Sequence, residues 1–363
     1  MDKLVSSWYN VRSVPEDYIF PPETRPGNLH VPIGEVIPVI DLSEAERGDR
    51  TATIQKILKA AQEFGFFRVI NHGVSQNLMN EAMSVFKEPF QWSNEAKQNL
   101  YSEDVSKHCR LKTCSIYCTT DKVHLWRDFL MHPCHPLEKW QHTWPLNPTR
   151  YQECVGACSV EVKKLASRIL AFICERPGLK CGYFDDELSG SMMLSVNHYP
   201  PCPQPSLTLG SSKHADLNLI TILLQDDVYG LQVLKEDKWI GVEPNPHAFV
   251  VNMGCLLQVI SNNKLKSAEH RVVTNPNTAR TSAAFFVLSL EDSIIEPAKD
   301  LTDVLHPPIY KPFKIKDFLT QFLAKNGDLW NKCAKYSLLF LALSTCKLKV
   351  VMTMNPNAVK LKL

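Results

Sequence analysis

Hydrophobic positions in the first half of the chain recur mainly at helical spacing. Apolar side chains three and four positions apart predict amphipathic helices over 51–64 and from Ser75 onward, and a longer helix over about 148–175. Two short runs rich in β-branched and aromatic residues, 36–40 and 66–70, flank the first helix and predict strands. The first half is therefore expected to be largely helical.

The pattern changes after Leu188, where short β-type runs alternate with turn residues. Residues 100–145 have no clear period, and one helical patch at 256–260 interrupts the later runs. Many short strands at this spacing predict a sandwich or barrel, and so an α+β protein with a mainly β core and a helical N-terminal region. The predicted strands are 192–199, 219–225, 231–234, 239–242, 248–252, 267–273 and 281–288.

Composition is that of a soluble globular protein. The net charge is +2, 44% of the residues are hydrophobic and 21% are charged, so neither nucleic acid nor an anionic membrane is an expected partner. The N-terminus lacks an apolar signal sequence, and the longest apolar run, 338–343, is too short to cross a bilayer. We expect a monomeric cytoplasmic protein with reduced cysteines and a small-molecule substrate.

Three polar residues in the β half have the types and spacing of a metal site. The chain has 12 His and 38 acidic residues among 363, so about 1.3 His-x-Asp/Glu matches arise by chance, and His214-Ala215-Asp216 alone is weak. The pattern His-x9-Arg-x-Ser, which begins at His270, has an expectation of about 0.03. Its position after the His-x-Asp motif favours a functional site.

His214 and Asp216 can present their side chains to one metal, because residues i and i+2 of a strand point to the same side. His270 lies in another β-type run and is expected to supply the third ligand from across the sandwich. Two imidazoles and one carboxylate suit non-haem Fe(II) and leave coordination positions open for a 2-oxo acid and dioxygen. The same ligands suit zinc, so a zinc hydrolase remains an alternative, although the sequence shows no general base beside the site.

Arg280 and Ser282 also share a strand side and can bind the carboxylate of an acidic co-substrate. Tyr199 and Asn197 face one way on an earlier strand and can add donors. A surface salt bridge is the alternative for Arg280, but the apolar residues 283–287 indicate an interior position, where an unpaired cation is costly.

Several motifs along the chain form one combined pattern. They are Ile37-Pro-Val-Ile-Asp-Leu42, Phe64-Gly-Phe-Phe-Arg-Val-Ile-Asn-His-Gly73, Asn197-His-Tyr-Pro-Pro-Cys-Pro203, Lys213-His-Ala-Asp-Leu-Asn-Leu-Ile-Thr-Ile-Leu223, Gly230-Leu-Gln-Val233, Ala268-Glu-His-Arg-Val272 and Arg280-Thr-Ser282. Together they resemble the plant 2-oxoglutarate- and Fe(II)-dependent dioxygenases of specialised metabolism, from about residue 35 to residue 325. Within that family, the resemblance to the hyoscyamine 6-dioxygenase-like members rests on Lys122-Val-His-Leu-Trp-Arg-Asp128, Glu161-Val-Lys-Lys-Leu165 and Ile295-Glu-Pro-Ala-Lys299.

The resemblance implies a double-stranded β-helix, or jelly roll, with a helical N-terminal region. It implies oxidative decarboxylation of 2-oxoglutarate to succinate and CO2, which Fe(II) and O2 couple to hydroxylation, epoxidation or desaturation of a small metabolite such as an alkaloid. It also implies ascorbate as a supporting reductant. The implied iron ligands are His214, Asp216 and His270. The implied 2-oxoglutarate residues are Arg280, Ser282, Tyr199 and Asn197. The candidate substrate-pocket residues are Trp126, Phe129 and Phe286, and for each of these three the alternative is ordinary core packing.

The resemblance also divides the chain. We expect an arm at 1–35, the helical region at 36–185, the Fe(II)/2-oxoglutarate core at 186–292, a C-terminal segment at 293–328 and an atypical Lys- and Leu-rich tail at 329–363. The family often has Asp where this chain has Cys255. Because the C-terminal segment of relatives often covers the mouth of the active site, the tail leaves a second hypothesis open, a catalytically impaired binding protein.

Overall fold

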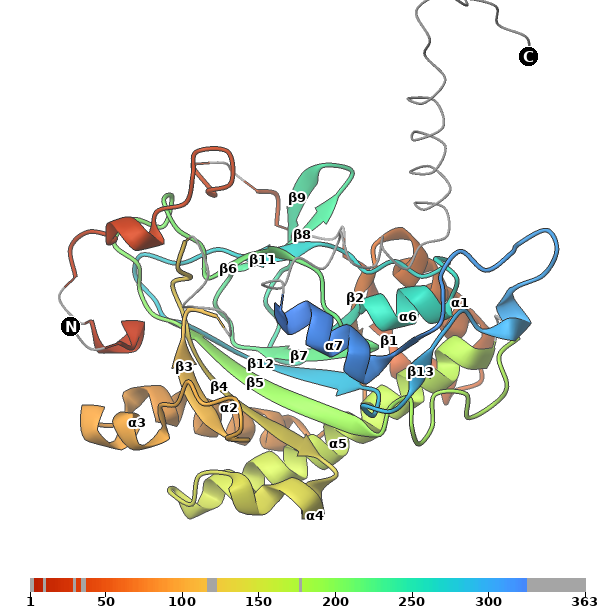
Figure 1. The fold of residues 1–363 in the computed structure, drawn as a ribbon, viewed down its shortest axis with the longest axis horizontal. Coiled ribbons are helices and arrows are strands. Elements are labelled where there is room, and N and C mark those ends of the chain that lie inside the picture. The colour runs from red at the N-terminus through yellow and green to blue at the C-terminus, as the bar shows by residue number, and fades with distance from the viewer. Residues whose placement is uncertain are drawn as a thin grey trace, which may run out of the picture.

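Two β-sheets face each other in the computed structural model, which describes residues 3–8, 11–28, 31–33, 37–115, 123–175 and 178–324 (Figure 1). The large sheet has the strand order β1-β2-β10-β7-β12-β5-β4-β3, and the small sheet has the order β6-β11-β8-β9. Apart from the parallel β1–β2 pair, neighbouring strands in both sheets are antiparallel. The predicted double-stranded β-helix with a helical N-terminal region is confirmed.

The large sheet consists of β1 (Val39–Asp41), β2 (Phe66–Ile70), β3 (Arg110–Thr113), β4 (Asp128–His135), β5 (Ser191–Tyr199), β7 (Ile220–Gln225), β10 (Phe249–Met253) and β12 (Arg280–Leu288). The small sheet consists of β6 (Ser211–His214), β8 (Leu231–Lys235), β9 (Lys238–Gly241) and β11 (His270–Val272). A short ribbon pairs β13 (Ile294–Ile295) with β14 (Phe313–Lys314). The helices are α1 (Arg50–Glu63), α2 (Gln76–Gln91), α3 (Asn94–Leu100), α4 (Leu137–Trp140), α5 (Thr149–Glu175), α6 (Cys255–Ile260) and α7 (Ile315–Ala324).

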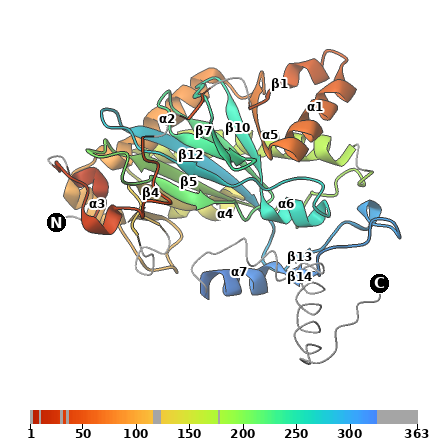
Figure 2. The same cartoon turned by 90° about the horizontal axis from the view of Figure 1, so that it is seen from above.

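The outer face of the large sheet packs against helices. α2 and α5 contact β12 and β7 on this side, and Figure 2 shows helices running along the sheet. Val196, Ala283 and Leu224 are paired across three neighbouring strands, and all three are buried in the main hydrophobic core. Burial of this apolar face holds the N-terminal helices to the β half.

The inner face of the large sheet, which looks toward the small sheet, is more polar and less buried. Gln225, Ser282 and Asn197 are paired across β7, β12 and β5, one position away from the buried outer row. On the same inner face, Leu223 and Phe286 remain only half-buried. The space between the sheets is therefore the place where polar chemistry and a ligand can meet.

Comparison with the sequence predictions shows where periodicity was informative. Every predicted strand and helix overlaps an observed one, and 66–70 coincides with β2. The interpretation of 100–145 as irregular was wrong, because it contains β3 and β4, which extend the large sheet. Ser75 precedes α2 as expected, but its side chain makes no capping hydrogen bond.

The N-terminal arm binds to the outer face of the large sheet at β4. The backbone N–H groups of Val5 and Ser6 donate to the two carboxylate oxygens of Asp128 at 3.0 and 2.7 Å. Trp126 lies beneath the arm, where its ring meets Trp8 and Tyr18 edge to face. None of the helices in the described ranges is both long and apolar enough to cross a membrane.

Candidate functional site

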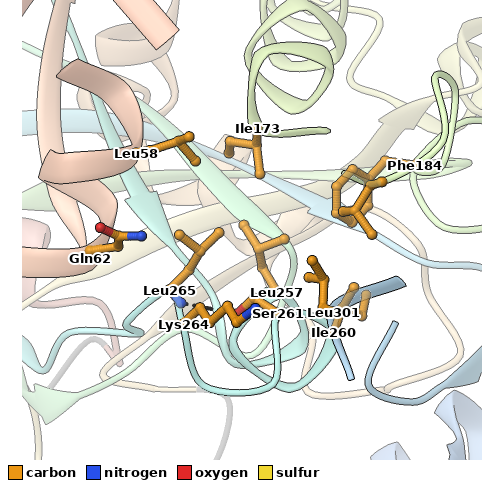
Figure 3. Close-up of a pocket in the computed structure, with 11 residues that line it drawn as sticks. Leu58, Gln62, Ile173, Phe184, Leu257, Ile260, Ser261, Lys264, Leu265 and Leu301 are labelled. Carbon is orange, nitrogen blue, oxygen red and sulfur yellow. Dashed lines mark hydrogen bonds between the residues drawn. The ribbon is translucent and has the colours of Figure 1, made fainter. Parts of the chain in front are cut away.

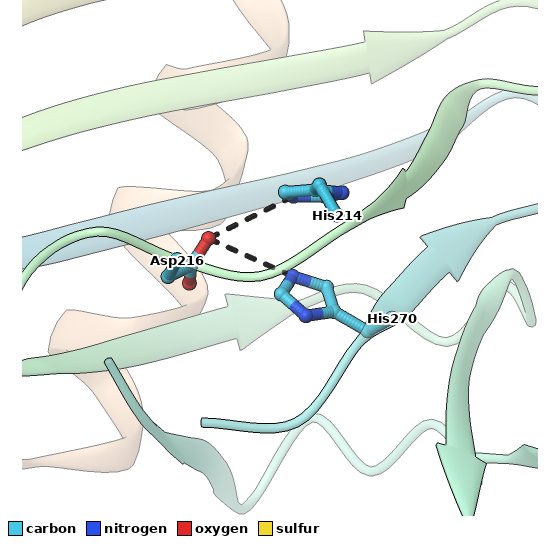
Figure 4. Close-up of side chains that lie close together, drawn as sticks. All are labelled: His214, Asp216 and His270. Carbon is cyan, nitrogen blue, oxygen red and sulfur yellow. Dashed lines mark ion pairs between the residues drawn. The ribbon is translucent and has the colours of Figure 1, made fainter. Parts of the chain in front are cut away.

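His214, Asp216 and His270 converge between the two sheets, with His214 at the end of β6 and His270 at the start of β11 (Figure 4). One Asp216 oxygen, Oδ1, lies 3.7 Å from Nε2 of each histidine, and the three ligand atoms lie within 4.8 Å of one another. In the described part of the chain, this is the one group of three or more His, Cys, Asp or Glu side chains placed to hold a metal.

The backbone selects the ring nitrogen that each histidine offers to a metal. Nδ1 of His214 lies 2.8 Å from the carbonyl oxygen of Ser212, and Nδ1 of His270 lies 3.2 Å from that of Ala268. Each Nδ1–H therefore donates to a backbone carbonyl, which leaves the Nε2 lone pair facing Asp216. Two imidazoles that offer Nε2 and one carboxylate fit a divalent iron ion.

The charge state of the ligands suits metal binding at neutral pH. Desolvation and the neighbouring His270 lower the pKa of His214 to about 4, so its ring is uncharged. Desolvation alone would raise the pKa of Asp216, but the two imidazoles and its hydrogen bonds lower it below the ordinary aspartate value. Neither ligand needs to lose a proton near pH 7 before it binds a cation.

Asp216 is supported by the large sheet although it follows a strand of the small one. Its Oδ2 accepts hydrogen bonds from the Thr221 hydroxyl at 2.5 Å and from Asn252 Nδ2 at 2.8 Å. Thr221 lies on β7 and Asn252 on β10, so the carboxylate connects the two sheets. These contacts orient Oδ1 toward the histidines. Thr221 lies within the motif over 213–223, but the motif by itself assigns it no role.

Two expectations about the ligand positions need correction. The sequence pattern predicts His214 and Asp216 as positions i and i+2 of one strand, but β6, which the pattern does not predict, ends at His214, and Asp216 lies beyond it. His270 comes from the adjoining strand of the same sheet and pairs with His214, rather than reaching across the sandwich. Antiparallel pairing therefore brings the histidine rings together, with centroids 4.2 Å apart.

The segment around Cys255 supports Asp216 through its backbone. The Cys255 N–H donates to the Asp216 carbonyl oxygen at 2.8 Å. A Cβ at Gly254 would collide with the Asn218 carbonyl oxygen, so glycine is needed where these two turns touch. The departure from the family pattern at Cys255 thus keeps the backbone contact to the metal ligand.

Arg280 is buried at the start of β12 with only 2% of its surface exposed. Its Nη1 donates to Ser282 Oγ at 3.2 Å and its Nη2 to Gln225 Oε1 at 3.0 Å, while Nε has no hydrogen-bond partner. Both partners are neutral, so the guanidinium charge is not neutralised by them. A buried cation with an unused donor fits the carboxylate of a co-substrate.

Tyr199 and two glycines shape the surroundings of this guanidinium. The Arg280 Cζ lies 5.2 Å from the centre of the Tyr199 ring, and the two residues pair across β12 and β5. A Cβ at Gly230 would lie 2.8 Å from Arg280 Cδ, and one at Gly210 would overlap the Tyr199 ring. Both glycines therefore leave the space that Arg280 and Tyr199 occupy.

A single strand joins the metal ligands to Arg280. Thr221 and Gln225 point to the same inner face of β7, four residues or roughly 13 Å apart along the strand. Thr221 holds Asp216, and Gln225 holds Arg280. The metal ligands and the buried guanidinium thus line one space between the sheets.

The other predicted residues have different surroundings. Asn197 pairs with Ser282 and Phe129, and all three face inward, as does the half-buried Phe286. Trp126 instead packs with the N-terminal arm and donates from Nε1 to the Pro200 carbonyl oxygen at 3.2 Å. The structure does not bring Trp126 to the metal ligands and places it as the core-packing alternative expects.

A separate apolar cavity of about 230 Å³ lies among α1, α5 and α6 (Figure 3). Leu58, Ile173 and Leu257 line it, together with the polar ends of Gln62 and Lys264. It contains neither the metal ligands nor Arg280, so it is distinct from the candidate site.

Comparisons with known proteins agree with this geometry. Residues 190–289 match the 2OG-Fe(II) oxygenase superfamily, and residues 37–149 match the family described as non-haem dioxygenase in morphine synthesis N-terminal. Hyoscyamine 6-dioxygenase of Hyoscyamus niger is 42% identical over 339 residues, which cover 90% of this chain and 96% of that protein. The chain belongs to the 2-oxoglutarate- and Fe(II)-dependent oxygenases.

Two further matches show how widely this family varies. Flavanone 3-dioxygenase 2 of Oryza sativa subsp. japonica is 38% identical over 319 residues, which cover 87% of this chain and 92% of that protein. The crystal structure of JOX2 in complex with 2OG, Fe and JA matches with a TM-score of 0.79 at 34% identity, over 89% of this chain and 94% of that one.

Membership establishes the reaction class. The protein is an Fe(II)- and 2-oxoglutarate-dependent dioxygenase, and the zinc hydrolase alternative is set aside because family membership and the buried Arg280 both indicate 2-oxoglutarate as co-substrate. The relatives are named for chemically different substrates, so the substrate has to be inferred from this chain's own residues.

Proposed function

We propose that this dioxygenase oxidises a small specialised metabolite in the cytoplasm by hydroxylation, epoxidation or desaturation, while 2-oxoglutarate is converted to succinate and CO2. The observation that carries the proposal is the shared inner face of β7, where Thr221 supports the metal ligand Asp216 and Gln225 supports Arg280. A metal and an acidic co-substrate can therefore be held side by side.

In this proposal His214, Asp216 and His270 hold Fe(II). When bound, the iron supplies activation of dioxygen at the expense of the co-substrate. The Nδ1–H bonds to backbone carbonyls keep the two imidazoles in the metal-binding tautomer, and the Thr221 and Asn252 donors keep Asp216 Oδ1 aimed at the metal position.

The co-substrate is assigned to Arg280, Ser282, Tyr199 and Asn197. Arg280 offers its unused Nε–H, Ser282 a hydroxyl and Tyr199 a phenol around one carboxylate. Asn197 pairs with Ser282 on the neighbouring strand and offers a side-chain amide to the co-substrate. Phe129 and Phe286, on the same inner face, are proposed to contact the substrate.

The test is formation of succinate from 2-oxoglutarate by the full chain with Fe(II), O2 and ascorbate in the presence of a plant metabolite extract. We expect succinate formation to depend on the extract and to be abolished in His214→Ala. Wild-type turnover in that variant would remove His214 from the metal site.

The same assay addresses the binding-protein hypothesis. The tail that motivates it, 329–363, lies outside the described residues. Iron binding by a folded protein that forms no succinate with any extract fraction would favour a binding protein over an active oxygenase. The proposed alkaloid substrate rests on the similarity to hyoscyamine 6-dioxygenase alone.

A further inference from the structure

A second guanidinium, that of Arg127, lies on the inner face of the large sheet. Its Nη1 donates to Asn197 Oδ1 at 3.2 Å, and its Cζ lies 5.1 Å from the centre of the Phe129 ring. Asn197 and Phe129 pair with each other across β5 and β4 and belong to the inner row that includes Ser282. Arg127 therefore points into the same space as the proposed co-substrate site.

The hydrogen bonds of Arg127 leave its charge without a counter-ion. Nε donates to the Cys114 carbonyl oxygen at 2.7 Å, and Nη1 donates to the Asn197 amide, so both acceptors are neutral. Among the described residues, Nη2 has no acceptor and no carboxylate lies within ion-pair distance. Arg127 is half-buried while its neighbours Trp126 and Asp128 are buried, and its charge acts on the ring of His214.

Few acidic side chains lie on the strands around it. Lys112 of β3 pairs with Phe129 in the inner row, and its charge acts on the carboxylate of Glu103. Apart from Asp41 at the far edge and Asp128, which binds the arm on the outer face, no described strand of the two sheets contains an acidic residue. The buried Asp226 directly follows β7 near Arg280, and Lys87 compensates its charge at 3.5 Å. Asp216 is thus the acidic group at the metal position, and it is a metal ligand.

The proposed function accounts for the other charges. Fe(II) carries two positive charges, Asp216 one negative, Arg280 one positive and a 2-oxoglutarate dianion two negative, so together they are neutral. Arg127 remains a half-buried cation with no anion beside it in the described part of the chain, so an anionic group of a ligand would find a charge partner here. A protonated amine would meet repulsion at the same place.

We propose that the primary substrate carries a carboxylate and that Arg127 binds it from the inner face of the large sheet. This inference rests on the proposed function and replaces an alkaloid amine with an organic acid as the expected substrate. Arg127 selects the substrate by its charge and by its planar pair of N–H donors. The Phe129 ring lies beneath the guanidinium and keeps it in position.

The first experiment asks which substrate charge the holoenzyme accepts. A plant metabolite extract is separated into anion-exchange-bound, cation-exchange-bound and unbound fractions, and succinate formation is measured with each. We expect the anion-exchange-bound fraction to support turnover. Turnover confined to the cationic or neutral fraction would overturn the inference and leave the proposed function intact, whereas no turnover with any fraction would refute both.

The second experiment uses the acid identified in that fraction, or the fraction itself at graded dilution. Arg127→Gln is expected to raise the KM for the acid about 10- to 100-fold, as for loss of a charge-assisted hydrogen-bond pair, while the 2-oxoglutarate KM changes less than about threefold. Arg127→Lys should recover part of the loss. The matched control is Arg47→Gln, which removes an exposed guanidinium far along the chain that pairs with Asp41.

The split between the two KM values decides the role of Arg127. An equal rise in both would mean that Arg127 acts by positioning Asn197 for the co-substrate, and substrate recognition would be rejected. Arg127→Glu gives an independent check, because reversing the charge should shift turnover from the anionic toward the cationic fraction. An unchanged preference for the anionic fraction in a folded Arg127→Glu protein would also overturn the proposal.

Discussion

Replacement of Thr221 by valine removes a hydrogen bond that supports a metal ligand, together with the one that the Thr221 hydroxyl accepts from Asn218 Nδ2 at 3.1 Å. The Thr221 hydroxyl donates to Asp216 Oδ2 at 2.5 Å, and Asn252 donates to the same oxygen at 2.8 Å. Valine keeps the β-branched shape in a strand but cannot donate. The variant therefore leaves all three proposed iron ligands in place and changes how firmly one of them is held.

The size of the effect follows from these contacts. A hydrogen bond to a charged group contributes about 1.5–3 kcal/mol, and loss of a partner of a metal ligand lowers metal affinity by about 10- to 100-fold. Because Asn252 still donates to Asp216, we expect the loss of metal affinity to lie at the lower end of this range, at about 10-fold or about 1.4 kcal/mol.

The pH dependence should change in a defined direction. The Thr221 hydrogen bond is one of the contacts that lower the pKa of Asp216, so its loss raises that pKa toward the ordinary value. A carboxylate with a lowered pKa keeps its charge until the pH falls through that pKa. The acid limit of metal binding should therefore move to higher pH in Thr221→Val.

Mn(II) titration of the chelator-treated protein, followed by the EPR signal of free Mn(II), measures this affinity without turnover. Thr281→Val is the matched control, because Thr281 is equally buried but faces the helices and contacts His198 at 3.0 Å. Parental Mn(II) affinity in a folded Thr221→Val protein would refute the idea that the large sheet controls the metal site through Asp216.

Three further outcomes test other parts of the site. Arg280→Lys keeps the charge but loses the planar fork, so we expect the 2-oxoglutarate KM to rise about 10- to 100-fold with Mn(II) affinity nearly unchanged; an unaltered KM would remove Arg280 from the co-substrate site. Gly230→Ala should also raise the 2-oxoglutarate KM, because the added Cβ would lie 2.8 Å from Arg280 Cδ and 3.0 Å from the Val273 carbonyl oxygen; kinetics equal to the parent would show that Arg280 shifts freely. Mn(II) at about 100 times its Kd should stabilise the folded chain by about 2.7 kcal/mol and raise the melting temperature by several degrees, reversibly with a chelator; no shift in Tm would contradict a metal site in the folded state.

Much of the local structure could be predicted from residue pattern because burial imposes its period on the chain. The long helix over 148–175 and the strands over 66–70 and 281–288 place one face in the core, so their apolar residues recur at the helical or strand period. β3, β4 and β6 were not predicted. In β3 (Arg110–Thr113) and β6 (Ser211–His214), polar residues on the inner face obscure the strand pattern.

The ligand types were readable from the sequence, but their support was not. His214, Asp216, His270 and Arg280 stand in motifs with recognisable spacing. Thr221 and Gln225, by contrast, are ordinary polar residues of a β-rich run. Their roles depend on which partners the sheet pairing places opposite them, and no spacing along the chain carries that information.

By itself, the sequence determined which atoms are available for the chemistry, since donor type and motif spacing define an Fe(II) and 2-oxoglutarate site. Only the tertiary structure decided that His214 and His270 are neighbours in one sheet, that Asp216 is held by the opposite sheet, and that Trp126 serves the arm. It also placed Arg127 beside the proposed co-substrate site, where its described hydrogen-bond acceptors are neutral. The physical reason is that hydrogen bonds and charge balance depend on distances between segments far apart in the chain, which cross-strand pairing sets.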